Sequence, residues 1–130
     1  MVEKMNQIIH TNDAPAAVGT YSQAVKNGQM VFLSGQIGLD PATGELVSDE
    51  FKGQVEQIFK NISAVIAASG GSLDNIVKFT VFLLDMTDFP TLNELMSEWL
   101  SEPYPARSAV GAASLPCNAK VEIETVLMLP

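Results

Sequence analysis

The chain has 130 residues, of which 47% are hydrophobic and 17% charged, and its formal net charge at pH 7 is −8. This length and composition are typical of one folded domain, spanning residues 1–130, and exclude a disordered chain. Seven Lys and Arg residues are too few for the basic surface that general binding to nucleic acids or to an anionic membrane requires.

The residues that bind metals or form disulfides are scarce. Cys117 and His10 are the only residues of their types, so neither an intrachain disulfide nor a Cys/His zinc site is predicted. The first ten residues lack the apolar stretch of a secretory signal, and no apolar run reaches the roughly 18 residues of a transmembrane helix. We therefore expect a cytoplasmic location.

Extended segments and turns alternate before the first helix. Residues 6–10 (NQIIH) are a short strand candidate, and residues 12–24 are predicted to form a loop. Residues 29–38 (QMVFLSGQIG) are dense in β-forming side chains and predict a strand, while residues 40–45 (DPATGE) predict a turn. The sequence also allows one more short strand before the first helix.

Two helices are predicted further along the chain. In residues 51–68 the apolar side chains recur every three or four positions, and two glycines follow, as at a helix C-terminus. Residues 87–100 predict a second helix, with Thr87 or Asp88 as its N-cap and Pro90 in its first turn.

Three further strands are predicted, at residues 76–85, 106–112 and 120–129. The first is so uniformly apolar that we expect both of its faces to be covered. The predicted elements define an α+β domain with two helices packed on one sheet. Because only a short turn-rich segment separates the last two strands, we expect them to pair in antiparallel fashion.

Arg107 raises the question of function, because it lies among small and apolar residues. In the register that keeps the apolar faces of the last two strands together, Arg107 shares a face with Glu122 and Glu124. One interpretation is a structural cross-strand ion pair. The other is a ligand site, in which the guanidinium binds a substrate carboxylate and a glutamate activates water.

The chain resembles the RidA family of enamine/imine deaminases, also called the YjgF family. Six segments carry the resemblance, occur in the family's order and cover nearly the whole chain. They are NDAPAAVGTYSQA (12–24), FLSGQIGLDPATGE (32–45), IVKFTVFLLD (76–85), DFPTLNE (88–94), PARSAV (105–110) and LPCNAKVEIE (115–124).

The resemblance implies a chorismate-mutase-like α+β fold, with a mixed sheet backed by two helices, and a homotrimer with clefts between its subunits. It also implies hydrolysis of reactive 2-enamine or 2-imino acids, such as 2-aminoacrylate and 2-iminopropanoate, to 2-keto acids and ammonia. Pyridoxal-phosphate-dependent dehydratases release such intermediates. Neither a metal nor an organic cofactor is expected.

The resemblance also implies roles for individual residues. Arg107 corresponds to the arginine that binds the substrate carboxylate, and Glu122 corresponds to the acid that positions the attacking water. The remaining residues expected to bind substrate in the cleft are Tyr21, Ser34, Gly35 and Asn93.

Four positions depart from the family's usual pattern. Thr20, Ala109, Gly111 and Ser114 stand where proline, cysteine, an acidic residue and a basic residue are common. They bear on the substrate preference. The alternative function is a non-catalytic trimer that binds small carboxylates or regulates a partner. Glu122 favours the enzyme, because a site that only bound carboxylates would gain nothing from an acid beside the anion.

Overall fold

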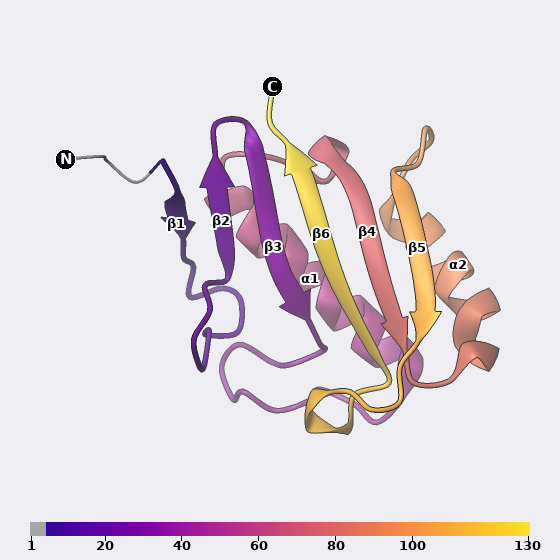
Figure 1. The fold of residues 1–130 in the computed structure, drawn as a ribbon. Coiled ribbons are helices and arrows are strands. Elements are labelled where there is room, and N and C mark those ends of the chain that lie inside the picture. The colour runs from indigo at the N-terminus through magenta and orange to yellow at the C-terminus, as the bar shows by residue number, and fades with distance from the viewer. Residues whose placement is uncertain (1–4) are drawn as a thin grey trace.

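The computed structural model describes residues 5–130, in which a six-stranded sheet carries both α-helices on one face (Figure 1). The helices are α1 (Phe51–Ala68) and α2 (Phe89–Trp99). The strands are β1 (Gln7–Ile9), β2 (Ala24–Asn27), β3 (Met30–Gln36), β4 (Ile76–Leu83), β5 (Ala106–Gly111) and β6 (Val121–Met128). The predicted α+β class is confirmed, and β2 is the additional short strand that the sequence left open.

The sheet is mixed, with strand order β1-β2-β3-β6-β4-β5. All neighbouring strands are antiparallel except β4 and β5, which are parallel and connected through α2. The C-terminal strand β6 therefore lies near the middle of the sheet, between β3 and β4 (Figure 1). The predicted antiparallel pairing of the last two strands is wrong, because β4 lies between them.

The core lies between the sheet and the two helices. The periodic apolar side chains of α1 are buried there, as the sequence predicted, and Gly70 follows the helix with a φ of +89°. The ring of Phe59 in α1 contacts Phe79 of β4 edge-on and stacks on Trp99 of α2. Neither α-helix of the described chain combines the length and apolarity that crossing a bilayer requires.

The opposite face of the sheet has no helix on it, and we call it the open face. Side chains alternate between the faces along β4, where the positions that face the helices are buried and those between them are not. The expectation that both faces of β4 are covered is therefore not met within one chain. Large apolar side chains on β3, β5 and β6 are also exposed there, with exposed fractions of 50% for Phe32, 45% for Val110 and 44% for Met128.

Candidate active site

Arg107 lies on the edge strand β5 and points toward the helices. Its position in the register is beside Phe79, which faces α1. Its Nη1 donates a hydrogen bond to Asn93 Oδ1 at 2.7 Å, and its guanidinium carbon lies 5.1 Å from the ring centre of Phe89. Two contacts from α2 thus fix the orientation of the guanidinium plane.

The positive charge of Arg107 has no acidic partner within residues 5–130, where the one ion pair joins Lys52 and Glu56. The interpretation of Arg107 as part of a structural cross-strand ion pair is therefore wrong. Arg107 and Asn93 instead line a pocket of about 400 Å³ whose other walls are mainly apolar, formed by Phe79, Met96, Leu100, Tyr104 and Pro105, with Ser97. A fixed cation at the wall of such a pocket suits an organic anion.

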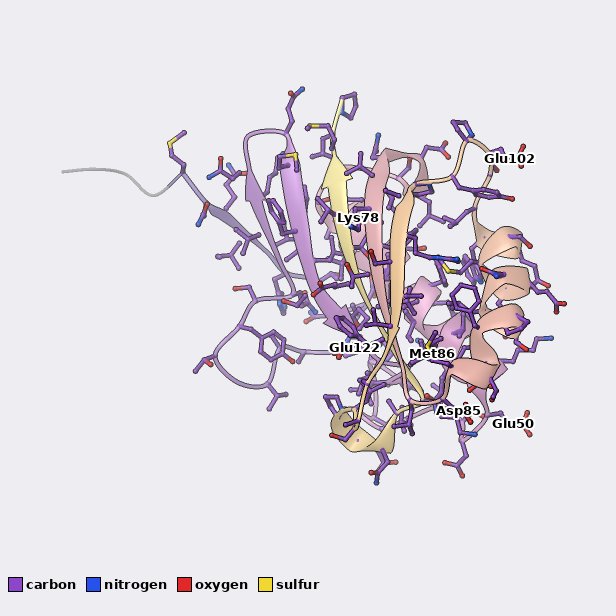
Figure 2. The ribbon with its side chains drawn as sticks, turned by 45° about the vertical axis from the view of Figure 1, so that its right-hand side comes forward. Glu50, Lys78, Asp85, Met86, Glu102 and Glu122 are labelled. Atoms are coloured by element: carbon purple, nitrogen blue, oxygen red, sulfur yellow. The ribbon has the colours of Figure 1, made fainter. Side chains whose placement is uncertain are left out.

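Glu122 lies on the other side of the sheet. It is partly buried and lines a second pocket, of about 520 Å³, together with Tyr21, Ser34 and Gly35. Figure 2 shows Glu122 on the sheet face turned away from α2. The structure therefore brings four of the predicted site residues together in one pocket and the other two, Arg107 and Asn93, in another.

The strand register explains this separation. Phe79 of β4 is level with Arg107 on β5, whereas Phe82 is level with Glu122 on β6. Residues level with one another share a face, and residues three apart on a strand lie on opposite faces. The prediction that Arg107 and Glu122 share a face of one sheet is therefore wrong, because it depended on direct pairing of β5 with β6.

A bulge in β3 brings backbone close to the Glu122 carboxylate. The register with β6 shifts between Leu33 and Gln36, so that Ser34 and Gly35 lie in the irregular part of the strand. A Cβ atom on Gly35 would lie 2.7 Å from Glu122 Oε2, closer than real side-chain contacts allow. Glycine at this position thus makes room for the carboxylate.

Burial raises the pKa of the Glu122 carboxyl above its ordinary value, and the nearby charge of Glu124 raises that pKa further. Glu122 therefore binds a proton more readily than a solvated glutamate does. Such a carboxylate is a stronger base, which is the property that proton abstraction from water requires.

The pocket wall beside Glu122 comes from the loop before β2. The hydroxyl of Tyr21 accepts a hydrogen bond from the backbone N–H of Val18 at 3.3 Å, so the ring is held by its own loop. Ser34 Oγ donates to the carbonyl oxygen of Ser22 at 2.6 Å. Tyr21 and Ser34 are thus held by hydrogen bonds to adjoining segments, and both line the Glu122 pocket.

Two residues without a predicted role in the site also line these pockets. Cys117, in the segment LPCNAKVEIE, has a φ of 57° and lines the Glu122 pocket. Met96 belongs to the core, with 5% exposed, and its sulfur lies 3.7 Å from Arg107 Nη1. Their places in the pockets depend on how distant segments fold together.

Replacing Gly35 with alanine tests the close approach at the bulge. We expect Gly35→Ala to lower kcat/KM for a 2-imino acid, the substrate class that the family resemblance implies, about tenfold or more, because the new methyl group displaces the Glu122 carboxylate. The melting temperature should change little, since the group that must move is the end of a flexible side chain. Gly53→Ala in α1 is the matched control, because its Cβ would lie nearly as close, 2.8 Å, to the side chain of Ser48, and neither residue lines either pocket. Equal activity losses in the two variants would contradict this assignment.

Comparison with known proteins identifies the family. The family model described as Endoribonuclease L-PSP matches residues 11–128, nearly the whole described chain. Matching proteins include one named Reactive Intermediate Deaminase A and one named RidA. The chain therefore belongs to the RidA family, as the six sequence segments predicted.

Individual relatives match over nearly their full lengths. The protein named 2-iminobutanoate/2-iminopropanoate deaminase from Dermatophagoides farinae is 45% identical over 95% of this chain and 96% of its own. The protein of the same name from Homo sapiens is 40% identical over 97% and 92% of the two chains.

Solved structures agree with the fold. The crystal structure of RidA from the Antarctic bacterium Psychrobacter sp. superposes with a TM-score of 0.92 at 57% identity, covering 95% of this chain and 99% of that one. TdcF from E. coli, solved with bound serine, gives a TM-score of 0.90 at 41% identity, covering 95% and 99%. The mixed sheet with two helices is therefore the fold of this family.

Proposed function

We propose that this protein hydrolyses reactive 2-enamine and 2-imino acids, such as 2-aminoacrylate and 2-iminopropanoate, to 2-keto acids and ammonia. The observation that carries the proposal is Glu122, a partly buried carboxylate with a raised pKa in a pocket with Tyr21 and Ser34. Relatives named as deaminases of these imines, at 40–45% identity, support the same activity.

The reaction requires two groups with different tasks. Arg107 binds the substrate carboxylate, and Asn93 holds the guanidinium in place. Glu122 accepts a proton from water while the water oxygen adds to the C=N carbon. Glu122 passes that proton to the nitrogen, and the hydroxyl proton of the adduct follows it. The C–N bond then breaks, so that ammonia leaves and the carbon becomes the carbonyl of the keto acid. Tyr21, Ser34 and the backbone at Gly35 border the reacting atoms.

These two groups cannot meet within one chain, because they lie on opposite faces of the sheet. We therefore propose that the active site forms between subunits, with Arg107 and Asn93 from one copy and the Glu122 pocket from the next. A cyclic homotrimer repeats this contact three times. The exposed apolar side chains Phe32, Val110 and Met128 on the open face provide the surface for such an assembly.

Several further assignments belong to this proposal. The reaction needs no metal or organic cofactor, and the substrate is supplied by pyridoxal-phosphate-dependent dehydratases. A cytoplasmic location is proposed for this chain, although the relative from Arabidopsis thaliana is named as chloroplastic. The family model's description names an endoribonuclease. A net charge of −8 disfavours binding to RNA.

A coupled assay tests the activity. Threonine dehydratase is run with and without this protein, and the release of keto acid and ammonia is followed. We expect acceleration by the wild type and about tenfold less from Arg107→Lys, because an ammonium cannot bind a carboxylate through two parallel hydrogen bonds. Lys60→Arg, an exposed substitution on α1, is the control that should keep full activity.

The alternative, a trimer that binds small carboxylates without catalysis, gives a different result in the same assay. Keto acid would bind to the protein, and Arg107→Lys would weaken that binding. The rate of imine hydrolysis would equal the rate in buffer, which would overturn the catalytic proposal.

A further inference from the structure

Gln23 is a buried polar residue beside the Glu122 pocket, and only 2% of it is exposed. Its Nε2 donates hydrogen bonds to the carbonyl oxygens of Thr11 and Pro15, each at 2.9 Å, with the carbonyl oxygen of Ala14 at 3.4 Å. Its Oε1 accepts a hydrogen bond from the backbone N–H of Thr11 at 2.7 Å. The side chain therefore uses both its donors and its acceptor on one loop.

The backbone of Gln23 connects this loop to the bulge in β3. The carbonyl oxygen of Gln23 accepts a hydrogen bond from the N–H of Ser34 at 3.0 Å. Ser34 in turn lines the Glu122 pocket, as do Pro15 and Tyr21 from the loop. One residue thus joins the two walls that flank Glu122.

We infer that Gln23 is a positioning residue, which holds the loop that carries Tyr21 at a fixed distance from Glu122. The effect of Gln23 on catalysis, unlike its effect on the loop, rests on the proposed function. Partly buried backbone groups of a loop need hydrogen-bond partners, and an amide of this length supplies donor and acceptor together. Methionine has a similar length and supplies neither, and a glutamate carboxylate supplies only acceptors.

The first measurement is amide hydrogen exchange by NMR in the full-length protein. In Gln23→Met, we expect the Thr11 amide to exchange about tenfold or more faster, because its acceptor is gone. The Ser34 amide should stay protected, since it bonds to the Gln23 backbone. Gln54→Met is the matched control, because Gln54 is equally buried but its bonds reach Ser48 and Lys120, which do not line the pocket.

The second measurement separates binding from turnover. We expect the Kd for 2-oxobutanoate, the stable keto acid, to rise about tenfold in Gln23→Met while the rate at saturating imine supply changes less than about threefold. Gln54→Met should lower the melting temperature and leave the Kd unchanged. A freed Thr11 amide with an unchanged Kd would overturn the positioning role, as would a Thr11 amide that stays protected.

Gln23→Glu keeps the inference testable if Gln23→Met does not fold. A protonated glutamate regains one donor. We therefore expect the ratio of the variant's Kd for 2-oxobutanoate to the wild-type Kd at the same pH to fall as the pH is lowered. A constant ratio would contradict the inference. If the wild type does not accelerate imine hydrolysis, the proposed function fails, whereas the exchange and Kd measurements still decide the role of Gln23.

Discussion

Arg107→Ala and Glu122→Ala subunits, each inactive alone, are expected to recover about one quarter of the wild-type activity when they are unfolded and refolded together. In a site shared between subunits, the arginine and the glutamate come from different chains. Random mixing then gives each site an intact Arg107 half of the time and an intact Glu122 half of the time. The measurement is keto-acid release per total subunit, with the trimer verified by light scattering.

A second mixture provides the control. Wild-type subunits are refolded with the double variant Arg107→Ala/Glu122→Ala in equal amounts. Shared sites again give about one quarter of the activity, whereas sites contained within one subunit give about one half. No recovery in the first mixture, together with one half in the second, would show that both groups act from the same chain.

The helices and most of the strands could be predicted from the sequence because their signals are local. The helical period over residues 51–68 coincides with α1, and the β-forming run at residues 76–85 contains β4, which ends at Leu83. The pairing of β5 was mispredicted, although a signal was present. A strand, a helix and a strand in succession favour a parallel pair with a crossover, which outweighs the short connection to β6.

The candidate site residues came from motif resemblance, and the geometry that the sequence predicted for them was wrong. Motif resemblance identified Arg107 and Glu122, and the structure places each of them in a pocket. Their separation depends on β4 lying between β5 and β6, which is a property of the whole sheet. Gln23 was missed for a similar reason, since its partners lie eight to twelve residues earlier, in a loop with no repeating pattern.

Glu122→Gln is expected to lower kcat by on the order of a hundredfold, because an amide can hold water but cannot accept its proton. The melting temperature should not fall, since burial and Glu124 both disfavour the charged form that the substitution removes. Glu98→Gln, an exposed glutamate on α2 that lines neither pocket, is the control for removal of one carboxylate. An unchanged kcat in Glu122→Gln would remove the general base from the mechanism.

The pH dependence gives a separate test of the same carboxylate. Glu122 must be ionised to accept a proton, so the rate should fall as the pH drops through its raised pKa. Glu124→Gln removes a neighbouring negative charge and so lowers the pKa of Glu122. The fall in rate should therefore occur at lower pH in this variant. If the rate of Glu124→Gln instead fell at a higher pH than that of the wild type, a group other than Glu122 would control the pH dependence.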